Sequence, residues 1–303
     1  MLLLIFTLLM NSSFNSGEAG FNFLKLTPSA KEAAMANATI GVENDKALSG
    51  FDFLYNPAQK LTNTSFGVGY LSLPAEINYG IVSYKRNRLL PFTHSSGVGL
   101  IFLNSGPIKH TDEQGNPIGT FSVSYANLIG SGTIVDNNEL KVGLNLKFIY
   151  GMIEKFYGLS LASDIGIRFI PPVKNLTTGA VIRNLGYQIK PFDTKSDKLP
   201  LEFGIGAGYK IEDNINLALD ICKSIDSPFF FCLGVEGWIN KYLALRGGYN
   251  SLRRDLTTGA GSDILAGFSI GLGVKVSKYQ LDYSFTPMLN LGRQHHLSLT
   301  LSP

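Results

Sequence analysis

Charged residues are scarce in this sequence. Asp, Glu, Lys and Arg make up 16% of its 303 residues, whereas a typical soluble domain carries about 25%. The formal net charge is only +3 and no block of basic residues stands out, so nothing indicates nucleic-acid binding. After the N-terminus, no apolar run reaches the roughly 18 residues that a transmembrane helix needs. These absences disfavour both an ordinary soluble surface and a helical membrane protein.

Residues that carry chemistry are scarce as well. The sequence has two cysteines and four histidines, and none of the histidines stands in an HExxH motif or two residues from a cysteine. There is no Gly-x-Ser-x-Gly motif, and the glycine-rich stretches lie inside expected strands rather than between a strand and a helix. We therefore predict no catalytic site, no metal site and no cofactor, and hence a protein that is not an enzyme.

What the sequence does have is a strand pattern that returns from about residue 64 to the C-terminus. One parity of Leu201–Tyr209 is apolar, and the other holds Glu202 and three glycines. Successive side chains of a strand point to opposite faces, so this segment has one apolar face and one small or polar face. The same pattern recurs in 140–148, 264–276 and 297–301.

About fourteen such strands are expected, enough for a sheet that closes on itself. They lie near residues 64–72, 77–86, 96–104, 119–127, 139–150, 157–170, 176–185, 199–211, 214–223, 228–238, 241–249, 262–276, 278–286 and 293–301. Connections from even-numbered to odd-numbered strands are mostly short, as at Ser277, and the others are mostly long, as at 251–261. Such alternation is typical of a barrel with an even number of strands.

Two all-β architectures use this pattern. A soluble sandwich or barrel turns its apolar parity inward and shows charged side chains to water. In 264–276, however, the parity opposite the apolar one is mainly glycine and serine. A transmembrane barrel turns its apolar parity to lipid and lines its lumen with the small and polar parity. We therefore predict a transmembrane antiparallel β-barrel in a bacterial outer membrane, with outer-membrane lipid against its wall.

The N-terminal part differs from the strand region. Residues 1–19 have the apolar core and small-residue end of a signal peptide, which predicts export. Beyond them, Thr27-Pro28 is a favourable start for a short helix over Ser29–Ala38, and a second short helix is expected near Asn44-Asp45. The expected divisions are a signal peptide at 1–19, a partly helical segment at 20–60 and a barrel at 61–303.

A series of short motifs runs along the whole chain. It comprises Phe23–Leu26, Ser29–Met35, Asn44-Asp45 and Asn56-Pro57-Ala58, then 164–166, 179–186, 245–249, 281–283, and Leu291-Gly292 with His295. This series resembles that of PorV/PorQ-type outer-membrane proteins, which belong to the wider FadL-like group of fourteen-stranded barrels. Residues 35–38 depart from the family pattern, because they lack the glycine pair usual after the methionine.

The resemblance implies both a fold and a function. Residues 20–60 would form a small plug inside the barrel near its periplasmic mouth, with Asn44, Asp45, Asn56, Pro57 and Ala58 as the plug motif. The function implied is a docking or conduit component in protein export of the type IX kind, with secretion-machinery or cargo proteins as partners.

The alternative function is a FadL-like passive transporter of hydrophobic small molecules such as fatty acids, with an apolar small ligand as partner. The lumen-facing parity is mostly Gly, Ser and charged, which favours the export function over the transporter. A purely structural role is a third class.

Charged side chains are expected on the lumen-facing parity. This polar lining consists of Lys147, Asp164, Arg168, Asp220, Glu236, Arg246 and Asp282. Mixed charges in such a place commonly pair with one another, and the alternative is a lining that guides or gates a passenger. Glu236 and Arg246 lie on adjacent expected strands and form the best candidate pair.

The two cysteines, Cys222 and Cys232, fall on the lumen-facing parity of neighbouring expected strands. An oxidising periplasm permits a disulfide between them. Cross-strand geometry is not always favourable, so a reduced pair is the alternative.

Overall fold

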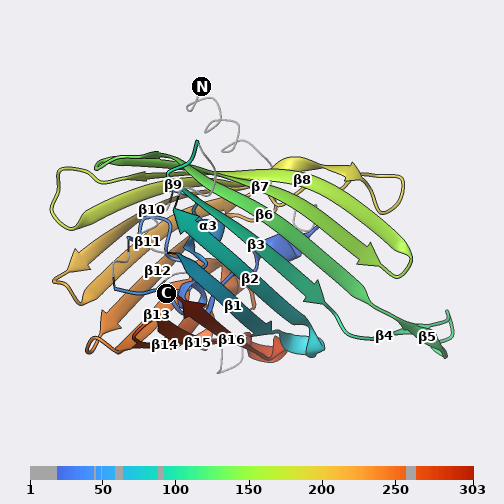
Figure 1. Cartoon of the computed structure of the whole chain (residues 1–303). Helices are drawn as coiled ribbons and strands as arrows, with labels where there is room; N and C mark the ends of the chain where they lie inside the picture. Colours follow the sequence, from blue (N-terminus) through green and yellow to red (C-terminus); the bar gives the residue numbers. More distant parts are fainter. Residues whose placement is uncertain (1–18, 44–45, 49, 59–63, 88–91, 257–263) are drawn as a thin grey trace.

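The computed structural model describes residues 19–43, 46–48, 50–58, 64–87, 92–256 and 264–303. Fourteen of the described strands close into one antiparallel barrel in which β1 pairs with β16 (Figure 1). Closure leaves no unpaired edge in the wall, which is what a sheet inside a bilayer requires. The predicted all-β barrel of about fourteen strands is therefore confirmed.

The barrel strands run in chain order around the wall. They are β1 (Ser65–Ser72), β2 (Asn78–Asn87), β3 (Ser95–Asn104), β6 (Val123–Asp136), β7 (Leu140–Ile153), β8 (Phe156–Phe169), β9 (Leu176–Lys190), β10 (Glu202–Ile211), β11 (Ile215–Ser224), β12 (Phe229–Trp238), β13 (Leu243–Asn250), β14 (Phe268–Val276), β15 (Tyr279–Pro287) and β16 (Arg293–Leu301). We call the end of the barrel that holds Ser65 and Leu301 the inner end, and the opposite end the outer end.

The remaining elements are short. Strands β4 (Ile108–Thr111) and β5 (Pro117–Phe121) form a separate hairpin that projects beyond the outer end (Figure 1). The helical turns are η1 (Asn22–Lys25), α2 (Ala30–Ala34), α3 (Asp52–Tyr55), η2 (Pro74–Glu76), η3 (Ser251–Leu256) and η5 (Leu289–Leu291). Among the described residues, none of these helices has the length and apolar character needed to cross a membrane.

Three of the expected strands have the wrong bounds, and one of them, expected over 176–185, continues as β9 to Lys190. The stretch 119–127 was expected as the fourth strand, but β6 starts at Val123 and continues to Asp136, where it pairs with both β3 and β7. Gly130 and Gly132 interrupt the apolar alternation there, so the sequence pattern ends too early. Residues 264–267 were expected inside a strand, but β14 begins only at Phe268.

The expected helix over Ser29–Ala38 is also too long, since α2 covers only Ala30–Ala34. Ala36 and Asn37 follow it with φ angles of 51° and 72°, a left-handed conformation that glycine adopts most readily. The chain therefore turns back where a helix was expected. The second expected helix, near Asn44-Asp45, lies outside the described residues, and α3 forms further along.

The outer surface of the barrel is apolar, as the strand pattern predicts. In β12, Phe229, Phe231 and Val235 are between 42% and 49% exposed. Phe230 and Glu236, which have the opposite parity, are buried. An apolar exterior with a small and polar interior is the arrangement of a barrel that sits in lipid.

The described part of residues 19–58 lies inside the barrel (Figure 1). Ala19 forms a bridge with Lys198 in the connection at the outer end, and Lys46 bonds to Asn214 in a turn at the inner end. We call residues 19–58 the plug. Its described residues run through the lumen from the outer to the inner end.

Glycines in the wall permit this close packing. A Cβ atom at Gly248 would collide with the backbone of Met35 and Ala36, and one at Gly143 would collide with the carbonyl oxygen of Pro57. The wall therefore needs glycine where the plug backbone touches it.

Candidate functional site

One side of the lumen is apolar. The residues that face the plug there, from β1–β3, β6 and β7, are Leu71, Tyr79, Ile81, Ile101, Leu103, Ile129 and Ile149; we call this set the apolar wall. The plug packs Phe51, Phe53 and Leu54 against it, and Phe23 stacks on Tyr125 with ring centroids 4.9 Å apart. The lumen-facing parity of these strands also holds Ser83, Lys85, Asn127 and Lys147, so the apolar wall is a cluster within a lining that is otherwise small or polar.

The opposite side of the lumen carries charge. The structure pairs Glu236 with Arg246, as expected, with the Arg246 Nε atom 2.7 Å from Glu236 Oε2. Arg246 Nη1 also lies 2.7 Å from Asp282 Oδ1 on β15. To reach Asp282, Arg246 passes over β14 at Gly273, where a Cβ atom would crowd both side chains. The three charges form one buried network in which each has a partner of opposite sign.

This side also holds the backbone of the plug. The Asp220 carboxylate accepts hydrogen bonds from the Thr39 and Ile40 amides at 2.8 and 2.9 Å. Gln280 Oε1 accepts one from the Leu48 amide at 2.6 Å. We call Asp220, Glu236, Arg246, Gln280, Asp282 and His296 the polar wall. Its side chains contact the plug mainly through hydrogen bonds, whereas the side chains of the apolar wall contact it by apolar packing.

A bulge between β8 and β9 explains the contacts of Asp164, another of the predicted lining residues. The register shifts between Ser163 and Ile165, and Asn184 has a φ angle of 59°. Asp164 accepts the freed Asn184 amide at 2.8 Å and pairs with Lys147 at 2.7 Å. A bulge leaves a residue out of the strand ladder, so Asp164 supplies the acceptor that the ladder lacks there.

All seven predicted lining residues thus lie on the lumen face and are buried. Arg168 is fully buried on the same face of β8. The contacts described above join six of them to one another, to neighbouring strands or to the plug. These contacts support the structural interpretation of the lining; a guiding or gating role stays a prediction.

The plug motif is described only in part, because Asn44 and Asp45 lie outside the described residues. Asn56 Nδ2 donates to the Ile40 carbonyl at 3.0 Å, and Asn56 Oδ1 accepts from the Ala58 amide at 3.0 Å. The Pro57 carbonyl accepts from Thr133 Oγ1 at 3.1 Å. The motif therefore ties two plug segments together and fastens them to β6.

The cysteines do not form the disulfide that was one of the two sequence-based alternatives. Cys222 lies opposite Phe230, and Cys232 lies opposite Asp220, so the two are offset by two positions on neighbouring strands. Both are buried free thiols. The reduced pair is the alternative that the structure contains.

Two cavities flank the plug at Lys25 and Leu26. One has a volume of about 200 Å³ and lies between the plug and β12–β16. The other, of about 70 Å³, reaches Tyr79, Ile101 and Ile129 of the apolar wall. Both are lined by Lys25, Leu26, Asn37, Glu202 and Phe230. We call them the large and the small central cavity.

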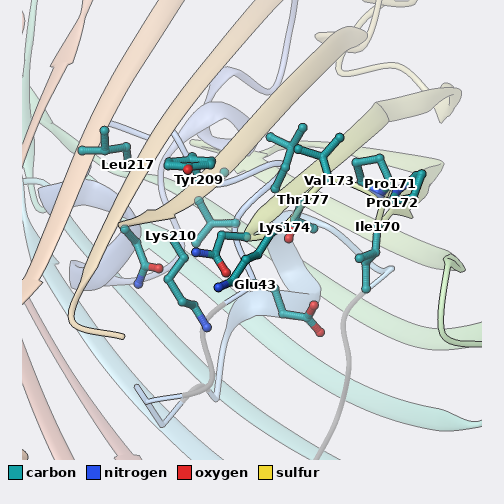
Figure 2. A pocket seen from close by; sticks show the side chains of 15 residues that line it. Glu43, Ile170, Pro171, Pro172, Val173, Lys174, Thr177, Tyr209, Lys210 and Leu217 are labelled. Atoms are coloured by element: carbon teal, nitrogen blue, oxygen red, sulfur yellow. The ribbon is translucent and has the colours of Figure 1, made fainter. Parts of the chain in front are cut away.

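A third cavity, of about 390 Å³, lies at the inner end. Figure 2 shows Glu43 of the plug facing Lys174 and Lys210 across it. Glu43 also pairs with Lys141 of β7 at 2.7 Å. The inner mouth of the lumen is therefore charged, while the central cavities combine apolar side chains such as Leu26 and Phe230 with polar ones such as Asn37 and Glu202.

Sequence reasoning missed the buried polar groups that border the central cavities. Among the described residues, Tyr79 Oη, Asn127 Oδ1 and both ring nitrogens of His296 are buried without a hydrogen-bond partner. The parity of each strand places these residues in the lumen, but nothing in the sequence indicates that they lack partners. The described residues contain no group of three or more His, Cys, Asp or Glu able to hold a metal.

Comparisons with known proteins support the fold. No protein-family model matches the sequence, and no curated protein matches it either. The structure is similar to CymD, a monoaromatic hydrocarbon channel, with a TM-score of 0.62 at 11% identity over 94% of this chain and 99% of that one.

Two further solved structures agree. The toluene transporter TodX of P. putida gives a TM-score of 0.61 at 11% identity, over 90% of this chain and 96% of that one. A FadL homologue of Pseudomonas aeruginosa gives 0.56 at 11% identity, over 91% and 98%. The fold is thus that of FadL-like barrels. With its apolar exterior, this fold agrees with the predicted location in a bacterial outer membrane.

Proposed function

We propose that this barrel is a passive transporter of hydrophobic small molecules across the outer membrane, without enzymatic activity. The observation that carries the proposal is the boundary between plug and apolar wall. There the small central cavity lies among Leu54, Ile101 and Ile129, and it shares Leu26 and Phe230 with the large central cavity. Concave, mostly apolar cavities with a few polar groups are typical of small-molecule sites.

The proposed path of the ligand rests on the two kinds of contact between the plug and the barrel wall. Apolar packing is non-directional, so side chains such as Leu54 can shift against the apolar wall without leaving hydrogen-bonding groups unpaired. The polar wall meanwhile keeps the plug in place through Asp220 and Gln280. An apolar molecule would thus move along the apolar wall while the lumen stays closed to ions. The similar fold of channels named for monoaromatic hydrocarbons and toluene supports this proposal.

Uptake in cells tests the proposal, because apolar solutes cross simple phospholipid bilayers without a protein. A bacterial strain without its own hydrocarbon channel would be given labelled p-xylene with and without this barrel. We expect faster uptake with the barrel. Ile101→Phe, which fills the small central cavity, should return uptake to the background.

Leu100→Phe is the matched control. Leu100 is the next residue of β3 but faces lipid, with 44% exposure against 8% for Ile101. The same added volume should therefore leave uptake unchanged. Equal uptake with and without the barrel, or equal loss in both variants, would contradict the proposal.

The second candidate is the export function of PorV/PorQ type, which the β4–β5 hairpin favours. This hairpin stands clear of the barrel with Ile108 and Ile118 exposed. Hydrogen bonds from the Asn116 side chain and amide to Asp112 order its tip and hold the pKa of Asp112 below its usual range. A protein partner that copurifies with the intact chain but not with a hairpin-deleted chain would favour this function.

A further inference from the structure

The large central cavity contains a buried polar side chain with no assigned use. His296 lies on the lumen face of β16, opposite Ser284 of β15 and Leu71 of β1. It is 1% exposed, and neither ring nitrogen has a hydrogen-bond partner among the described residues. Its neighbour His295, on the lipid face, shares a 2.8 Å hydrogen bond with Tyr283. A buried polar group without a partner costs about 1–3 kcal/mol, so the unpaired ring of His296 is energetically unfavourable.

The charged residues around the same cavity already have partners. Lys25 pairs with Asp226, and Glu202 pairs with Arg183. Arg253 Nη1 donates to Ser269 Oγ at 2.7 Å. His296 is therefore a buried polar side chain of this cavity, among the described residues, whose two ring nitrogens have hydrogen-bonding capacity to spare.

The size and lining of the cavity suit one small ring. Its volume of about 200 Å³ exceeds the roughly 150 Å³ of a protein cavity known to hold benzene. Leu26, Leu71, Phe230 and Met288 supply apolar contacts, and Ser284 lies beside His296.

The chemistry of the imidazole selects the polar group of the ligand. Burying an unpaired imidazolium is far costlier than burying the neutral ring, and a neutral ring has one donor and one acceptor nitrogen. A hydroxyl both donates and accepts, so it can bond to either nitrogen, whereas a carboxylate can only accept. The second torsion of histidine is soft, so a small turn of the ring brings a nitrogen to the cavity.

We propose that the large central cavity binds a single-ring apolar molecule that carries a hydroxyl group, with the hydroxyl bonded to His296 and the ring between the plug and β12–β16. The proposal rests on the proposed function, since it names the substrate class of the same transport path. It makes His296 a specificity-determining residue that favours phenols over hydrocarbons of equal shape.

The test compares p-cresol with p-xylene, which differ by one hydroxyl in place of a methyl. Equilibrium dialysis against barrels in nanodiscs, corrected with empty nanodiscs, gives both affinities. In His296→Leu the preference for p-cresol relative to p-xylene should fall about tenfold, the worth of one hydrogen bond. His296→Gln, which keeps a donor and an acceptor, should restore most of it. Comparing ratios removes the difference in solubility between the ligands.

Thr300→Val is the control, because Thr300 shares the strand and face of His296 but does not line the cavity. Each variant is checked for folding by the migration of unheated barrel on a denaturing gel. An unchanged ratio in His296→Leu would overturn this inference while p-xylene binding keeps the proposed function. If neither p-cresol nor p-xylene binds, both this inference and the proposed function are contradicted. Tighter binding of 4-methylbenzoate than of p-cresol would also overturn the inference, in favour of a carboxylate held by Arg253.

Discussion

The two sides of the lumen hold the same plug by different balances of apolar packing and hydrogen bonding. On the apolar wall, Phe51, Phe53 and Leu54 pack among aliphatic side chains, and Ser83 and Asn145 beside it donate to the carbonyls of Gly50 and Phe53. On the polar wall, Asp220 and Gln280 accept hydrogen bonds from the plug backbone. Hydrogen bonds are lost when groups move by an ångström or so, whereas apolar contacts tolerate sliding. Under the proposed function, the polar wall anchors the plug and the apolar wall borders the passage.

The largest expected effect is the loss of the central cation on the polar wall. Arg246→Ala leaves the buried Glu236 and Asp282 carboxylates without the guanidinium that bridges them, which should lower the free energy of unfolding by about 3–5 kcal/mol. Urea unfolding of the barrel measures this loss. The triple variant E236Q/R246M/D282N removes all three charges and should lose much less. Equal losses in the two variants would show that the network acts by packing rather than by charge.

The next effect belongs to the apolar wall. Phe53 is 2% exposed, and its ring lies against the backbone at Gly97. Phe53→Ala should cost about 3–5 kcal/mol of stability and widen the boundary between plug and wall. We expect faster p-xylene uptake with no increase in ion conductance. A rise in conductance would mean that the plug is held by its aromatic residues rather than by the polar wall.

A smaller loss of stability, together with a rise in ion conductance, is expected when Asp220 of the polar wall is replaced. Asp220→Ala leaves the Ile40 amide without its acceptor, at a cost of about 1–3 kcal/mol, while the Thr39 amide keeps the Asn37 carbonyl at 3.0 Å. Ion conductance in planar bilayers should rise as the plug loosens. Asp220→Asn keeps an acceptor oxygen and should stay close to the unmodified barrel. Conductance that is unchanged in both would remove the anchoring role.

No effect on uptake is expected at the β4–β5 hairpin. Its residues lie outside the barrel, and Ser105 and Val123 at its base are already hydrogen-bonded to each other. Replacing 107–121 by a two-residue Asn-Gly turn should leave p-xylene uptake and unfolding unchanged. Loss of uptake would place part of the passage in the hairpin.

The barrel was predictable from sequence because the alternation of residues within each strand distinguishes its two faces. The alternation in Leu201–Tyr209 is a local property, and fourteen such segments require closure. Pairs across neighbouring strands, such as Glu236 and Arg246, follow from the same parity. Strand bounds failed where glycines hid the alternation, as at Gly130 and Gly132 in β6.

The site was less predictable, because it depends on contacts between distant parts of the chain. The apolar wall gathers single residues, such as Leu71, Ile101 and Ile149, from strands whose lumen parity otherwise looks polar. The bulge at Arg183 and Asn184, opposite Asp164, shifts the register within β9. The offset of Cys222 from Cys232 depends on strand register. The lack of a hydrogen-bond partner for His296 depends on packing, and strand parity reveals neither.

The passage along the plug is the central claim, and a heavy-atom ligand tests it most directly. A crystal of the barrel soaked with 4-bromotoluene would locate the bromine by anomalous scattering. The account predicts a bromine peak in the central cavities, close to Leu26 and Phe230. Bromine found only on the lipid face of the barrel, with the lumen empty, would contradict it.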